Sequence, residues 1–160
     1  MQILVLGGTQ FVGHAFVHEA LARGADVVVA NRGVTEAPPP GVEHVTIDRL
    51  QPGAYDSLVG RGFDVVVDTW SRAPYVVRDA ARALGPSTGR WVYVSSRSVY
   101  AWPPPRYGDE SVPVVDGDPD ADATEYPFDK RGGEPALERE LGGDRVAHLR
   151  AGLILGPRDN

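Results

Sequence analysis

The chain opens with a short apolar run that leads directly into a glycine-rich segment. Residues Ile3–Leu6 are continuously apolar, which is typical of a buried strand in a parallel sheet, and residues 7–13 read Gly-Gly-Thr-Gln-Phe-Val-Gly. A strand, a glycine turn and the start of a helix form a layout that binds dinucleotides, because the N–H groups and positive end of the helix attract a pyrophosphate. Gln10 replaces the usual middle glycine, although its amide can donate to a phosphate. The binding residues predicted in this segment are Gly7, Thr9, Gln10, Phe11, Val12 and Gly13.

Strand-like and helix-like patterns alternate along the rest of the chain. This alternation predicts an α/β fold with a doubly wound parallel sheet, a Rossmann fold of three α/β/α layers with strand order 3-2-1-4-5-6. The length of 160 residues fits one domain, so residues 1–160 are predicted to form a single NAD(P)-binding domain. We predict strands at 3–6, 26–30, 42–47, 64–68, 90–95 and 145–149, helices at 11–23, 54–59, 74–84 and 124–141, and a long loop at 101–122.

Composition excludes several classes of function. The net charge of −6 disfavours nucleic acids and anionic membrane surfaces, both of which need clustered Lys and Arg. The chain has no cysteine, which excludes disulfides, thiolate nucleophiles and cysteine-based zinc sites. We find no transmembrane or signal-peptide pattern and therefore expect a cytoplasmic protein. His14 and His18 are spaced as half a metal site, but we interpret them as a solvated helix face and predict no metal.

The residues after the second predicted strand bear on the choice of cofactor. NAD sites usually place an acid there to bind the ribose hydroxyls, whereas an arginine suits the 2′-phosphate of NADP. This chain has Asn31 and Arg32 and no acid, which favours NADP over NAD because a guanidinium binds phosphate in a bidentate manner. The alternative is that Arg32 is a solvated loop residue. Asp48 follows the third predicted strand, where it would meet the adenine amino group or cap the loop.

A second group of residues predicts proton-transfer chemistry. Tyr126 and Lys130 form a Y-x-x-x-K pattern, which places both side chains on one face of a helix. A neighbouring ammonium stabilises a phenolate, and a tyrosine tuned in this way exchanges protons with a substrate hydroxyl or carbonyl. Ser96 follows the fifth predicted strand, at the sheet edge where α/β proteins bind ligands, and can hold the same substrate oxygen.

These motifs resemble those of the extended and atypical short-chain dehydrogenase/reductases, the NAD-dependent epimerase/dehydratase family. The matching segments are 7–13, 31–33, 95–100, 126–130 and 149–157. Within the family, segments 7–13 and 31–33 together resemble the branch that contains chloroplast stem-loop RNA-binding proteins and bacterial oxidoreductases of unassigned substrate. The resemblance implies that Tyr126 is the acid/base, that Lys130 holds the nicotinamide ribose and tunes the tyrosine, and that Ser96 polarises the substrate oxygen. It also implies that the cofactor trough is lined by Asp68, Thr69 and Trp70.

The sequence departs from the family pattern at several points. Besides Gln10, Ala151 stands where relatives often have proline, and we expect Pro135 to kink the predicted catalytic helix at a cost of about 3 kcal/mol. Relatives continue into a second, substrate-binding region, so we expect this chain to be the N-terminal part of a longer architecture.

Three functions remain open at this point: an NAD(P)-dependent oxidoreductase or epimerase, a dinucleotide-binding module without turnover, and an RNA-binding relative, which the acidic charge disfavours. The expected partners are a nicotinamide dinucleotide and an unidentified small-molecule substrate. Membranes are not expected partners, and self-association into a homo-oligomer is left open.

Overall fold

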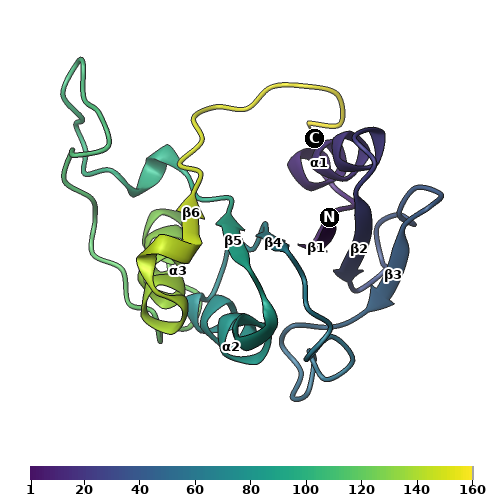
Figure 1. The fold of residues 1–160 in the computed structure, drawn as a ribbon. Coiled ribbons are helices and arrows are strands. Elements are labelled where there is room, and N and C mark those ends of the chain that lie inside the picture. The colour runs from purple at the N-terminus through teal and green to yellow at the C-terminus, as the bar shows by residue number, and fades with distance from the viewer. Residues whose placement is uncertain (160) are drawn as a thin grey trace.

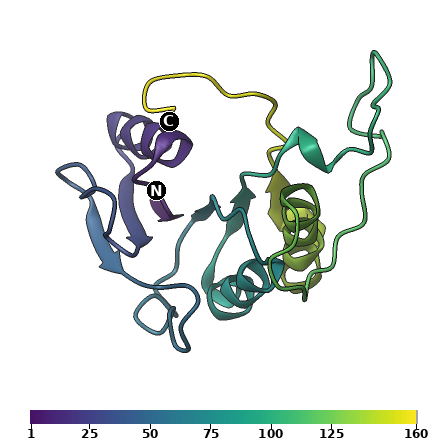
Figure 2. The same ribbon diagram turned by 180° about the vertical axis from the view of Figure 1, so that it is seen from behind.

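Six parallel strands, in the order β3-β2-β1-β4-β5-β6, form the central sheet of the computed structural model, which describes residues 1–159 (Figures 1 and 2). This confirms the predicted Rossmann-like fold and strand order. The strands are β1 Gln2–Leu6, β2 Asp26–Asn31, β3 Glu43–Thr46, β4 Val65–Asp68, β5 Arg90–Tyr93 and β6 Val146–His148. The helices are α1 Phe11–Ala22, α2 Pro74–Leu84 and α3 Tyr126–Leu141, with three short 3-10 turns at Gly85–Ser87, Arg97–Val99 and Gly143–Arg145.

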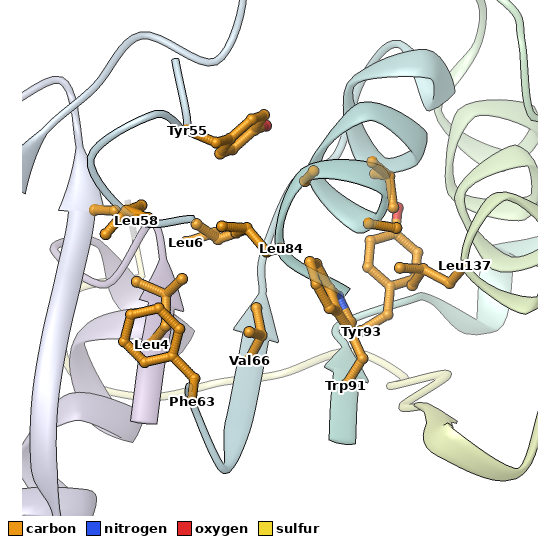
Figure 3. Packing of buried hydrophobic residues seen from close by; sticks show 14 of the residues in the cluster. Leu4, Leu6, Tyr55, Leu58, Phe63, Val66, Leu84, Trp91, Tyr93 and Leu137 are labelled. Carbon is orange, nitrogen blue, oxygen red and sulfur yellow. The ribbon is translucent and has the colours of Figure 1, made fainter. Parts of the chain in front are cut away.

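Alternation along the strands divides the core between the two faces of the sheet. Leu4 and Leu6 of β1 belong to a cluster that includes Leu84 of α2 and Leu137 of α3 (Figure 3). Ile3 and Val5, which alternate with these residues in β1, belong to a second cluster that contains Val17 of α1. Because successive strand residues point to opposite faces, α1 covers one face, and α2 and α3 cover the other.

The helix predicted at residues 54–59 is wrong. The chain forms a succession of turns there, between Gly53 and Gly60, which have φ values of +71° and +77°. Most of the backbone bonds in the segment span three residues rather than four. The segment nevertheless buries Tyr55 and Leu58 in the core, so its apolar residues serve packing without a helix (Figure 3).

The helix α3 does not break at Pro135 but runs as one α-helix of 16 residues. Its two glycines allow close packing. A Cβ on Gly133 would lie 2.6 Å from the Tyr93 hydroxyl oxygen, and a Cβ on Gly132 would lie 2.5 Å from the Pro74 ring. The unusual composition of this helix therefore reflects its close approach to β5 and α2.

Strand β1 lies where the direction of winding reverses, with β2 on one side and β4 on the other. Hydrogen bonds fix the three carboxyl ends together: the Gly7 N–H donates to the Ala30 carbonyl (3.0 Å), and the Thr69 hydroxyl donates to the Leu6 carbonyl (3.0 Å). Ligands of open α/β sheets bind at such a switch point. In the described residues, no helix combines the length and apolar character needed to cross a bilayer.

Candidate functional site

A cavity of about 480 Å³ opens at the carboxyl ends of β1, β2 and β4. Its walls come from the glycine turn, the loop after β2, the start of the loop after β3 and the loop after β4. A second cavity, of about 400 Å³, adjoins it towards β5 and β6. Gln10, Thr69 and Ser71 line both cavities, so the two meet beside the start of α1.

The glycine turn is closely packed at both of its ends. Gly7 has φ +121°, and a Cβ there would lie 2.2 Å from the Thr69 hydroxyl oxygen. A Cβ on Gly13 would lie 2.9 Å from the Gly8 backbone, so a side chain would force α1 away from the turn. Gln10 precedes α1 in an extended conformation, and its side chain does not cap the helix. The first turn, which contains Phe11 and Val12, thus faces the second cavity without a side-chain cap.

Asn31 supports the turn from the end of β2. Its amide nitrogen donates to the Gly7 carbonyl (2.7 Å) and to the Thr9 hydroxyl (3.3 Å), and its oxygen accepts the Gly33 N–H (2.8 Å). These bonds use the side chain for scaffolding, although Asn31 also lines the first cavity. They hold Arg32 between Asn31 and Gly33, with its exposed side chain on the cavity wall.

Asp48 lines the first cavity, and its carboxylate accepts the Leu50 N–H at 3.1 Å. Thr69 and Trp70 also line this cavity, as expected, but Asp68 does not. The Asp68 carboxylate is fully buried and accepts two hydrogen bonds from the Arg49 guanidinium, at 2.7 and 2.8 Å. The Asp68 carboxylate is therefore buried behind Arg49, which lines the cavity in its place. Sequence reasoning missed the role of Arg49, because its partner lies on a different strand.

The second cavity brings together the three predicted catalytic residues. Ser96, Tyr126 and Lys130 line it, opposite Phe11 and Val12 at the start of α1. The Ser96 hydroxyl oxygen accepts the Ser98 N–H at 3.1 Å, and its own proton is not used in that bond. Tyr126 is the first residue of α3 and is 48% exposed. A hydroxyl and a phenol therefore face one solvent-accessible space at the sheet edge.

Lys130 lies one turn further along α3 and is buried. Its ammonium donates to the carbonyls of Trp70 (2.5 Å) and Val94 (2.6 Å), which lie just after β4 and β5, and is 4.8 Å from the centre of the Tyr93 ring. Burial lowers the pKa of Lys130 to about 8. The two carbonyls use two of the three N–H donors and leave one for a partner in the cavity.

Glu134, which sequence reasoning missed, ties together the segments that carry these residues. It is fully buried in α3 and accepts two hydrogen bonds from Arg150 (2.9 and 2.8 Å) and one from the Ser95 hydroxyl (2.7 Å). Burial alone would raise the pKa of Glu134, but the hydrogen bonds from Arg150 and Ser95 hold it below its usual value. Its position four residues after Lys130 was the available signal, since it places Glu134 on the same helix face.

The family model of the NAD dependent epimerase/dehydratase family matches residues 3–160. The chain belongs to this family. The resemblance carried by the glycine turn and by Tyr126 and Lys130 is therefore confirmed at the level of the family. No curated protein matches the sequence of the chain.

Solved structures of several enzymes share the fold. They include WbmH of Bordetella bronchiseptica in complex with NAD⁺ (TM-score 0.76, 20% identity, 99% of this chain and 57% of that chain). The UDP-glucuronic acid 4-epimerase of Bacillus cereus in complex with NAD gives a TM-score of 0.70 at 18% identity, over 99% of this chain and 59% of that chain. A UDP-galactose 4-epimerase gives a TM-score of 0.69 at 23% identity, over 92% of this chain and 55% of that chain. This chain thus spans little more than half the length of these neighbours.

The residues of the two cavities fit the cofactor that the family name implies. The glycine turn has no room for side chains at Gly7 or Gly13, and the first turn of α1 has no side-chain cap. Arg32 supplies a positive charge on the wall of the first cavity. Uncapped helix N-termini and arginines both favour phosphate groups. Within residues 1–159, no group of three or more His, Asp or Glu side chains is arranged to hold a metal ion.

Proposed function

We propose that this chain binds a nicotinamide dinucleotide across the two cavities and is the cofactor-binding part of an oxidoreductase or epimerase. The observation that carries the proposal is the second cavity, where Ser96, Tyr126 and Lys130 face the start of α1. Because this cavity shares Gln10 and Thr69 with the first, an extended ligand can reach from Arg32 to Tyr126. The NAD-bound neighbours of the same fold support the choice of ligand.

In this proposal Tyr126 transfers the proton. Its exposed hydroxyl exchanges a proton with a substrate hydroxyl or carbonyl oxygen, and the free Ser96 proton forms a hydrogen bond to the same oxygen. Lys130, one helical turn away, supplies a positive charge that favours the phenolate and an N–H for a ribose hydroxyl. The bound dinucleotide would supply hydride transfer. NADP is the preferred form, because Arg32 lies exposed on the wall of the first cavity.

Binding and turnover test the proposal separately. We expect wild-type protein to bind NADPH more tightly than NADH in a calorimetric titration, whereas failure to bind either would contradict the proposal. We expect Tyr126→Phe to keep both affinities within about twofold and to lower kcat by at least 100-fold, the lower end of general acid–base contributions. The natural full-length protein is assayed with a panel of UDP-sugars, the substrate class named for the epimerase neighbours. Full activity of Tyr126→Phe would remove the catalytic assignment.

A second candidate is a dinucleotide-binding module without turnover. It is favoured by Lys130, whose ammonium is already bound by two carbonyls instead of being directed at the Tyr126 hydroxyl. Under this alternative, wild type and Tyr126→Phe bind cofactor equally and neither oxidises nor reduces any UDP-sugar. Reduction of bound NADP⁺ by one member of the panel would exclude it.

A further inference from the structure

Two arginines on the wall of the first cavity have no ion-pair partner in residues 1–159. They are Arg32, after β2, and Arg72, in the loop after β4, and both are exposed. The third arginine of this wall, Arg49, is neutralised by Asp68. Two free guanidinium groups are therefore available to a ligand.

The first cavity is positively charged in a chain whose net charge is −6. Asp48 is the only carboxylate on the described wall of this cavity, and it accepts the Leu50 N–H. With Arg49 balanced by Asp68, the charges that remain are those of Arg32 and Arg72 against Asp48. The excess is positive, so the cavity suits an anionic ligand.

The two free arginines belong to different parts of the site. Arg72 directly follows Ser71, one of the three residues that line both cavities, and therefore lies next to their junction. The junction also includes Gln10, the residue before α1, and Thr69, which packs against Gly7. Arg32 follows β2 and comes from a segment that lines only the first cavity. The junction is thus where a ligand passes the N-terminus of α1.

We propose that Arg72 binds the pyrophosphate of the dinucleotide from the loop after β4, beside the glycine turn. This inference rests on the proposed function and assigns Arg72 as a further binding residue of that site. Each phosphate carries a negative charge, whereas a helix N-terminus contributes only about half a positive charge. Lys130, the lysine of the second cavity, is held by two carbonyls, whereas Arg72 lies beside the junction and has no ion-pair partner within residues 1–159. A guanidinium binds two phosphate oxygens in a bidentate manner.

The position of Arg72 predicts a pattern that differs from that of Arg32. The pyrophosphate is common to NAD and NADP, whereas the 2′-phosphate occurs only in NADP. Arg72→Gln should therefore lower the affinities for NADH and NADPH by the same factor, about tenfold for the loss of one charge-assisted contact. Arg32→Gln should lower the affinity for NADPH and leave the affinity for NADH within about twofold of wild type. Arg72→Lys keeps the charge but loses the bidentate geometry, so its affinities for both dinucleotides should lie between those of wild type and Arg72→Gln.

The experiment is a calorimetric titration of each variant with NADH and with NADPH, repeated at two salt concentrations. Arg106→Gln is the matched control, because Arg106 is also an exposed loop arginine but lines neither of these cavities. We expect it to bind as wild type does. Arg72→Gln should also show a weaker salt dependence than wild type, since one phosphate contact is gone.

Three results would overturn the assignment of Arg72: unchanged affinities in Arg72→Gln, a loss confined to NADPH, or an equal loss in Arg106→Gln. Failure of the proposed function looks different, because wild type itself would then bind neither dinucleotide. Thermal unfolding of each variant accompanies the titrations. Because the Arg72 side chain is exposed, the Tm of Arg72→Gln should match that of wild type. A lowered Tm together with lost affinity would also overturn the assignment and attribute the effect to folding.

Discussion

The ammonium of Lys130 lies among backbone carbonyls and an aromatic ring rather than in solvent. Burying a charge is unfavourable, and here it lowers the pKa of Lys130 to about 8, from the ordinary value of 10.5 for a solvated lysine. Between these two values the unfolded chain binds a proton that the folded protein has released. The free energy of unfolding therefore rises with pH in this range.

We predict that this rise is specific to Lys130. Between about pH 8 and pH 10, wild type should gain stability relative to Lys130→Met with a slope of at most about 1.4 kcal/mol per pH unit. Above this range the buried Tyr93, whose pKa is raised by burial, should lower the stability of both proteins, because it ionises more readily in the unfolded chain. Urea unfolding at several pH values measures the difference. Parallel pH profiles of the two proteins would contradict the prediction.

At the scale of single residues, the sequence predicted positions better than contacts. The spacing of Tyr126 and Lys130 predicted that they share a helix face, and both line the second cavity. The spacing could not predict the acceptors of the ammonium, the carbonyls of Trp70 and Val94, because these residues lie far away in sequence, just after β4 and β5. The ion pair of Asp68 with Arg49 could not be predicted for the same reason, because the two residues are also far apart in sequence.

At the scale of elements, α3 shows that the composition of a helix does not reveal the contacts that its residues make. Pro135 predicted a kink, and Gly132 and Gly133 are likewise unfavourable residues in a helix interior. The structure supplies the compensation. Gly132 and Gly133 admit Pro74 and the Tyr93 ring into close contact, and Glu134 anchors the same turn to Arg150. The turns at residues 54–59 show the opposite case, in which an apolar pattern predicted a helix that does not form. The apolar residues are buried there, but the flanking glycines adopt the left-handed region and the chain forms turns.

We predict that Gly133→Ala destabilises the protein even though alanine is the better helix former. The new Cβ would lie 2.6 Å from the Tyr93 hydroxyl oxygen and 2.8 Å from the adjoining ring carbon. Overpacking of this kind costs about 1–3 kcal/mol, which outweighs a gain in helix propensity of about 1 kcal/mol. Urea unfolding measures the change.

Gly143→Ala is the matched control for this substitution, because nothing lies within 4 Å of the Cβ it would add. We expect it to change the free energy of unfolding by less than about 1 kcal/mol. Combining Gly133→Ala with Tyr93→Phe should recover part of the loss, since the nearest clashing atom is then gone. Equal stabilities of Gly133→Ala and wild type would show that α3 can move away from β5.

At the scale of the whole molecule, the order of elements predicted the arrangement most fully. Strands alternating with helices gave the sheet order, because right-handed crossovers permit few topologies, and the order placed the glycine turn at the switch point. Ser96 and Tyr126 could therefore be expected at one sheet edge. The division of that edge into two cavities, and the free guanidinium of Arg72 beside their junction, depend on loop conformations that no periodic pattern encodes.

The distribution of charge over the molecule predicts that RNA does not compete with the dinucleotide. The chain has 16 Lys and Arg against 22 Asp and Glu. Several of its arginines are also neutralised by carboxylates, among them Arg78 and Arg139 on Asp120 and Arg150 on Glu134. Binding to nucleic acid backbones requires basic side chains that neutralise phosphates. Because many of the basic side chains of this chain are paired with carboxylates, few are available for RNA.

We expect a fluorescent single-stranded RNA to show no anisotropy change at 150 mM KCl, a roughly physiological ionic strength, with or without saturating NADPH. A tight, salt-sensitive complex that NADPH displaces would contradict this expectation and place RNA in the positively charged first cavity.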